Sequence, residues 1–112
     1  MGPLVHHVFF WLKNPNSEED RMLFLENLCK LKDIETVKYF HVGMPADTAK
    51  RPVIDSSYTF TEMLVFDSVD DEAEYQSHPL HKAFIENCSH LWEKVLVYDS
   101  LYITEDLEKL KS

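Results

Sequence analysis

Four segments of the chain carry the apolar patterns of β-strands. The first, residues 4–13, has Val, Phe, Trp and Leu on both alternation phases and is interrupted by His6 and His7. Apolar side chains on both phases indicate a strand that is buried on both of its faces. Residues 35–42, 58–66 and 95–103 are predicted to form three further strands, and Glu62 is the odd residue on the aromatic phase of the third strand.

Two helical regions are predicted between these strands. Each follows a serine with an aspartate three residues later, a pattern that resembles a capping box: Ser17 with Asp20, and Ser68 with Asp71. The first helix is expected over residues 18–32, where apolar residues recur at the spacing of one helical face. Pro79 divides the second region, because proline suits the first turn of a helix and disfavours helix at the residue before it.

The order of these elements is strand, helix, strand, strand, helix pair, strand. This order predicts an α+β fold of the ferredoxin-like βαββαβ type, with both helical regions on one face of a four-stranded antiparallel sheet. The other face would then expose large apolar side chains, and a patch of that size is rarely left in water. We therefore expect two protomers to pair into a homodimer, a dimeric α/β barrel.

The length of 112 residues predicts one domain, residues 1–103, followed by a charged tail, residues 104–112. The 20 acidic and 11 basic side chains give a formal net charge of -9, which disfavours nucleic acid and anionic membrane surfaces as partners. No apolar run approaches the roughly 20 residues that cross a bilayer, and no secretory leader is visible. The two cysteines, Cys29 and Cys88, are predicted to be buried thiols of a cytoplasmic protein.

Three segments together resemble the stress-responsive dimeric α/β-barrel family, often called Dabb. They are the opening strand, residues 5–13, the run from Glu74 to Phe84 with its Tyr-x-x-His-Pro-x-His motif, and the closing Val-Leu-Val-Tyr-Asp of residues 95–99. The likeness covers roughly residues 4–103. It implies a ferredoxin-like protomer whose sheet packs against a twin, with a cavity between sheet and helices in each subunit.

The resemblance also implies candidate residues. A plant member of the family is a polyketide cyclase that uses a Tyr and the second His of the motif, which correspond to Tyr75 and His81, and its first-strand His is similar to His6. The chain departs from the family in residues 45–57, a longer loop than usual, and in Ser57, where a Gly is common. Long loops of this kind are often functional.

Acid–base chemistry beside a carbonyl group would suit these catalytic candidates. His81 is expected in the first turn of a helix, where the positive end of the helix dipole keeps an imidazole neutral and able to accept a proton. Tyr75 could donate a hydrogen bond to a substrate oxygen as negative charge develops on it. In the structural alternative, Tyr75 and His81 are packed and hydrogen-bonded parts of the scaffold, and His78 only ends one helix and begins the next.

The candidate ligand-binding residues are mostly aromatic. They are His6, His78, Trp11, Phe60 and Phe84. Aromatic residues of this kind could line an apolar cavity, although they are more often part of a core.

Neither a metal nor a cofactor is expected. His78 and His81 lie three residues apart, but no pattern of carboxylates or thiolates accompanies them. The only glycines, Gly2 and Gly43, provide no glycine-rich phosphate loop.

Three functions remain open on the sequence alone. The first is a Dabb-like homodimer that binds a small apolar or carbonyl-containing molecule in a cavity. The second is a cofactor-free cyclase-like or lyase-like enzyme that uses His81 and Tyr75. The third is a non-catalytic stress or interaction protein.

Overall fold

Strands and helices follow one another in the order expected from the sequence. The computed structural model describes residues 2–104, so the predicted tail lies outside the described residues from residue 105 onward. The elements are β1 (Leu4–Leu12), α1 (Glu18–Leu28), the 3-10 helix η1 (Cys29–Asp33), β2 (Tyr39–Gly43), β3 (Phe60–Phe66), α2 (Val69–Ser77), α3 (Pro79–Cys88), the 3-10 helix η2 (Ser89–Leu91) and β4 (Trp92–Leu101).

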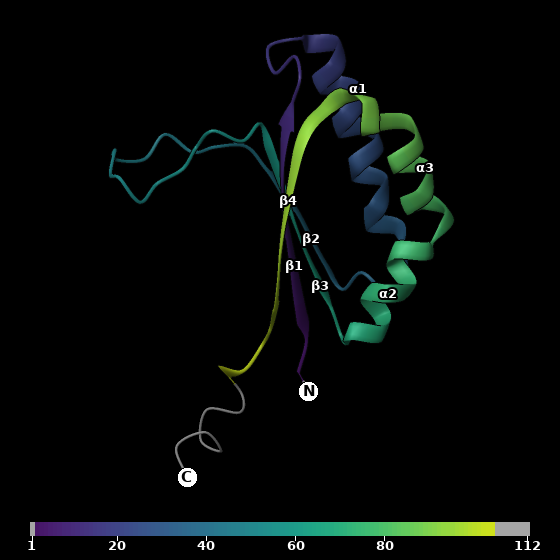
Figure 1. Ribbon diagram of the computed structural model, residues 1–112. Coiled ribbons are helices and arrows are strands. Elements are labelled where there is room, and N and C mark those ends of the chain that lie inside the picture. The colour runs from purple at the N-terminus through teal and green to yellow at the C-terminus, as the bar shows by residue number, and fades with distance from the viewer. Residues whose placement is uncertain (1, 105–112) are drawn as a thin grey trace.

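The four strands form one sheet in the order β2-β3-β1-β4, and every neighbouring pair is antiparallel. All three α-helices lie on the same side of this sheet (Figure 1). The ferredoxin-like βαββαβ prediction is therefore confirmed. β1 is an inner strand between β3 and β4; one of its apolar phases faces the helices, and the other lies on the face of the sheet without helices.

The core lies between the sheet and the helices. Along β1, alternate residues from Leu4 to Leu12 face the helices and are buried, while the residues between them are only partly buried. Phe24 of α1 packs into the middle of this layer, and its ring is stacked on that of Phe60 at a centroid distance of 5.5 Å. Fully burying one such side chain contributes about 1.5–3 kcal/mol, so this layer holds the helices to the sheet.

Both predicted N-caps are present. The Ser17 hydroxyl accepts a hydrogen bond from the Asp20 amide at 3.2 Å, and the Ser68 hydroxyl accepts one from the Asp71 amide at 3.1 Å. Each bond satisfies one of the free N–H groups in the first turn of its helix, which fixes the starts of α1 and α2.

Several element boundaries differ from the expected ones by a few residues. The α-helical part of the first helix ends at Leu28, and η1 continues it to Asp33 instead of an α-helix to residue 32. β2 begins at Tyr39 rather than at residue 35, because the chain first turns with a hydrogen bond from the Val37 amide to the Ile34 carbonyl at 3.0 Å. β3 begins at Phe60 rather than at residue 58, and β4 extends over residues 92–101 rather than 95–103.

The face of the sheet opposite the helices is uncovered in the single chain. It carries Phe9 and Trp11 of β1, Tyr39 of β2, and Leu96 and Tyr98 of β4, and the two tyrosines are 51% and 60% exposed. The segment between β2 and β3 extends away from the sheet on this side (Figure 1). This apolar face is the one that the sequence predicted to need a partner.

Candidate functional site

Three aromatic side chains from three different elements meet under the helices. Tyr75, in the last turn of α2, lies 4.7 Å from the ring of His81 and 5.9 Å from the ring of His6, measured between ring centroids. His81 belongs to the first turn of α3, and His6 faces the helices from β1. The structure thus brings together both catalytic candidates and the first-strand histidine.

A cavity of about 170 Å³ lies between the sheet and the helices, and His6 and His81 line it while Tyr75 lies behind them and does not. The polar groups that line it are His6, Glu62, Gln76 and His81, and the rest of its wall is apolar: Val8, Phe10, Phe84, Ile85, Trp92, Val95 and Val97. Ile85, Val95 and Val97 are 39%, 37% and 44% exposed, so the cavity opens between α3 and β4. A cavity of about 150 Å³ can hold a benzene molecule, so this one has room for a six-membered ring.

His6 is held in one orientation by the edge strand. Its Nδ1 lies 2.6 Å from Oδ1 of Asp99, its register partner on β4. A carboxylate only accepts hydrogen bonds, so Nδ1 carries the proton and donates it to this bond. In this tautomer of the neutral ring, the other ring nitrogen of His6 is a hydrogen-bond acceptor.

Tyr75 has a buried hydroxyl that no other group of the described chain satisfies. Its side chain is fully buried, and the hydroxyl oxygen has no hydrogen-bond partner. Burial, together with the Glu62 and Glu72 carboxyls, raises the pKa of this phenol far above its usual range, so it remains a hydrogen-bond donor. A buried polar group without a partner costs about 1–3 kcal/mol, and such a group is exceptional in a folded protein.

His81 is neutral at physiological pH. Its pKa is lowered, mainly by burial and further by the neighbouring His6. A hydrogen bond with the Gln76 backbone and the charge of Glu72 act in the opposite direction but do not outweigh the burial. A neutral imidazole can accept a proton, which is the property that a general base needs.

Sequence reasoning missed three polar residues of this site, Glu62, Gln76 and Asp99. Glu62 interrupts the aromatic phase of β3, and that interruption was a visible signal that a buried carboxyl faces the helices. Asp99 gave no comparable signal, because its contact with His6 depends on the register between β1 and β4, which lie far apart in the chain.

Three predicted ligand-binding residues do not line this cavity. His78 caps α3, with its Nδ1 accepting a hydrogen bond from the Leu80 amide at 3.1 Å and its Nε2 lying 3.3 Å from Oε2 of Glu35. Phe60 is buried in the core against Phe24. Trp11 lies on the face of the sheet without helices, so its side chain is separated from the cavity by the sheet itself. Of the five, only His6 and Phe84 line the cavity.

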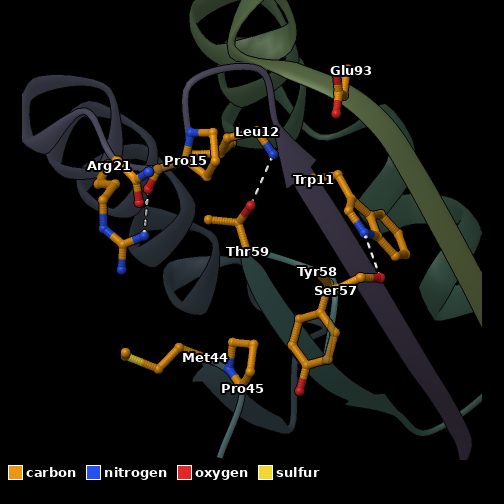
Figure 2. Close-up of a pocket in the computed structure, with 11 residues that line it drawn as sticks. Trp11, Leu12, Pro15, Arg21, Met44, Pro45, Ser57, Tyr58, Thr59 and Glu93 are labelled. Carbon is orange, nitrogen blue, oxygen red and sulfur yellow. Dashed lines mark hydrogen bonds between the residues drawn. The ribbon is translucent and has the colours of Figure 1, made fainter. Parts of the chain in front are cut away.

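A larger hollow of about 350 Å³ lies at the end of β1 beside the segment between β2 and β3 (Figure 2). Three of the polar groups there are hydrogen-bonded within the lining: Trp11 donates from Nε1 to the Ser57 hydroxyl at 3.0 Å, and Arg21 donates to the Pro15 carbonyl at 2.8 Å. The Leu12 amide likewise donates to the Thr59 hydroxyl at 3.0 Å. The smaller cavity is the better candidate site, because a buried oxygen of Glu62 in its lining has no hydrogen-bond partner within residues 2–104 and both catalytic candidates lie at or beside it.

Within residues 2–104, no three or more His, Cys, Asp or Glu side chains gather in a way that could hold a metal ion. In the same part of the chain, no helix has the length and apolar character needed to cross a bilayer.

The fold and the cavity define the class of this protein: a ferredoxin-like α+β domain with a small, mostly apolar cavity between its sheet and its helices. The chain belongs to the Stress responsive A/B Barrel Domain family, Dabb, whose family model matches residues 4–101. The family resemblance seen in the sequence is thereby confirmed. No curated protein matches the chain.

Solved structures with the same fold support this membership. A Dabb family protein with a ferredoxin-like fold from Mesorhizobium loti is 28% identical, with a TM-score of 0.75 over 91% of this chain and 98% of that one. A dimeric ferredoxin-like protein from Thermobifida fusca is 19% identical, with a TM-score of 0.72 over 90% and 92% of the two chains. A hydroxynitrile lyase from Passiflora edulis is 20% identical, with a TM-score of 0.72 over 90% and 94%. At these last two identities the likeness concerns the fold alone.

Proposed function

We propose that the protein binds a small carbonyl compound in the cavity between sheet and helices and catalyses proton transfer at the carbon next to the carbonyl. The observation that carries this proposal is the meeting of His6, Tyr75 and His81 beside a cavity, with the Tyr75 hydroxyl buried and unpaired. A bound carbonyl oxygen would supply the partner that this hydroxyl lacks.

Each of the three residues has a distinct part in this reaction. His81, neutral because burial lowers its pKa, takes the proton from the carbon beside the carbonyl. The Tyr75 hydroxyl donates a hydrogen bond to the carbonyl oxygen and stabilises the enolate that forms there. His6 is a positioning residue: Asp99 fixes its ring, which packs edge-on against Tyr75 and holds that side chain in place.

An enolate formed in this way can add to a second carbonyl group, or form when such an addition is reversed. Cyclase-like and lyase-like reactions both belong to this class. The Passiflora edulis protein supports the proposal only to the extent that a lyase exists on the same fold.

Proton exchange with solvent tests the reaction without knowledge of the natural substrate. Cyclohexanone, whose ring fits the cavity, would be incubated with the protein in D₂O, and loss of the signal of its α-protons followed by NMR. We expect the protein to accelerate the exchange and His81→Ala to reduce the acceleration by about 10²-fold or more, the usual contribution of a general base. A matched control is His90→Ala, because His90 is exposed and does not line the cavity. Equal rates for His81→Ala and the unchanged protein would refute the role of His81.

We also propose that the protein is a homodimer in which a second copy covers the apolar face of the sheet. Phe9, Leu96 and Tyr98 lie on this face, and leaving them in water is unfavourable. The dimeric protein from Thermobifida fusca shares the fold. Sedimentation at micromolar concentration is expected to give twice the protomer mass, and Phe9→Glu, which places a charge on this face, is expected to give a monomer. Met22→Glu, at a 60% exposed site on α1, is the control that should remain dimeric.

We propose a cytoplasmic location. Both cysteines are free thiols, and Cys88 is buried in the core, as expected of a protein from a reducing compartment. Fractionation of the source cells with detection of the protein in the cytosolic fraction tests this.

A further inference from the structure

Glu62 is the one carboxyl group among the buried residues of the described chain. It lies on β3 with its side chain directed toward the helices, and it is only 2% exposed. In the register of the sheet its neighbours are Val42 on β2 and Val8 on β1, so neither adjacent strand offers it a polar partner. Carboxyl groups are almost never fully buried unless they are paired.

The Glu62 side chain is not paired. Its Oε2 has no hydrogen-bond partner within residues 2–104, and no lysine or arginine is among the described residues that line the cavity. Glu62 lines the same cavity as His6 and His81, and it lies near enough to Tyr75 to affect the titration of the phenol. Tyr75 does not itself line the cavity, but its ring packs against those of His6 and His81, which do. The unpaired buried oxygens of Glu62 and Tyr75 therefore lie at and next to the same cavity.

These two oxygens point to a ligand with two polar groups. We propose that Glu62 determines which ligand the cavity accepts, by hydrogen bonding a hydroxyl group that lies next to the ligand's carbonyl. This inference rests on the proposed function, in which Tyr75 binds the carbonyl oxygen. The ligand class is a small, uncharged hydroxy-aldehyde or hydroxy-ketone of about the size of a six-membered ring.

The electrostatics of the cavity favour an uncharged ligand. Burial raises the pKa of Glu62 to about 8, so the carboxyl is protonated at neutral pH and can both donate and accept a hydrogen bond. The titratable groups around it are His6 on β1, Tyr75 on α2 and His81 on α3, and Asp99 on β4 is bound to His6. A carboxylate ligand would lose its hydration here without finding a cationic side chain in the lining, which is costly.

The test compares two probes that differ by one hydroxyl group, 2-hydroxycyclohexanone and cyclohexanone. Their dissociation constants would be measured by NMR titration for the unchanged protein, Glu62→Met and Leu64→Met. We expect the unchanged protein to prefer the hydroxyketone by about tenfold, in line with one good hydrogen bond, and Glu62→Met to lose this preference. Leu64→Met is the matched control, because Leu64 is buried on the same strand and faces the same side. It should keep the preference.

A second measurement does not depend on the stability of the methionine variant. The C=O stretching band of a protonated carboxyl can be assigned to Glu62 by its absence from Glu62→Gln, and it should shift when the hydroxyketone binds but not when cyclohexanone binds. An unchanged preference in Glu62→Met, or a band that does not shift, would overturn the role of Glu62 while cyclohexanone binding and its His81-dependent exchange still stand. If cyclohexanone itself does not bind, the proposed function fails, and the role of Glu62 fails with it.

Discussion

Replacing Glu62 by glutamine should stabilise the protein, and the gain should grow as the pH rises. The glutamine side chain has the same shape and can also form hydrogen bonds, but it cannot ionise. In the unchanged protein, ionisation of the Glu62 carboxyl is opposed by its burial, which raises its pKa from 4.5 to about 8. Between about pH 4.5 and pH 8, the folded state therefore retains a proton that the unfolded chain has already released.

The sign and the size follow from this difference. For a raised acid pKa, the contribution to stability is fully present below pH 4.5 and is lost as the pH rises through about 8. Each pKa unit corresponds to about 1.4 kcal/mol, so the full loss is about 5 kcal/mol. Between about pH 5 and pH 8, the free energy of unfolding of Glu62→Gln should rise by about 3–4 kcal/mol relative to the unchanged protein. For a domain of this size that is a large part of the total stability.

Urea denaturation at a series of pH values measures this difference. Protomer concentration must be kept constant, because the stability of a dimer depends on it. Glu26→Gln provides the control, since Glu26 is exposed on α1 and its replacement should leave the pH dependence unchanged. A constant difference between Glu62→Gln and the unchanged protein over the whole range would show that the Glu62 carboxyl is not kept neutral in the folded state.

Three further predictions concern separate parts of the molecule. Tyr75→Phe removes the unpaired hydroxyl, so the free energy of unfolding should stay the same or rise by about 1 kcal/mol. The exchange rate of cyclohexanone should fall by about 10²-fold in the same variant. A loss of stability would show that the hydroxyl has a partner in the folded protein. Ser68→Ala removes the N-cap of α2 and should lower stability by about 1 kcal/mol in urea denaturation, whereas Ser77→Ala, at an exposed position on the same helix, should not. Burial and the neighbouring His41 lower the pKa of His7, so the free energy of unfolding should fall as the pH drops below about 6.5, and His7→Phe should reduce this dependence in urea denaturation.

The elements with local signals were predictable from the sequence. The N-caps Ser17 and Ser68 were identified because a cap depends on residues only three positions apart. The start of β2 was placed too early because Val37 has a strand-like side chain but takes part in a turn with Ile34. Propensity does not distinguish these two states when the decisive contact is a backbone hydrogen bond.

The candidate site was predictable only in part, because some of its contacts are not between residues close together in the chain. Tyr75 and His81 lie in one short motif, so the family resemblance was enough to pair them, and the structure places their rings in contact. The partner of His6 depends on strand register, and no pattern along the chain relates it to Asp99. Trp11 was chosen as a cavity residue because it is aromatic, but a shift of one residue along a strand places a side chain on the opposite face of the sheet.

The junction at Pro79 has a consequence for how the cavity is built. Tyr75 lies in the last turn of α2 and His81 in the first turn of α3, and His78 serves as the C-cap of the first and the N-cap of the second. The two rings therefore belong to separate helices joined at His78, and the angle between α2 and α3 sets the spacing of the rings. Substitutions near this junction would thus change the spacing of the two rings beside the cavity while the sheet beneath stays the same.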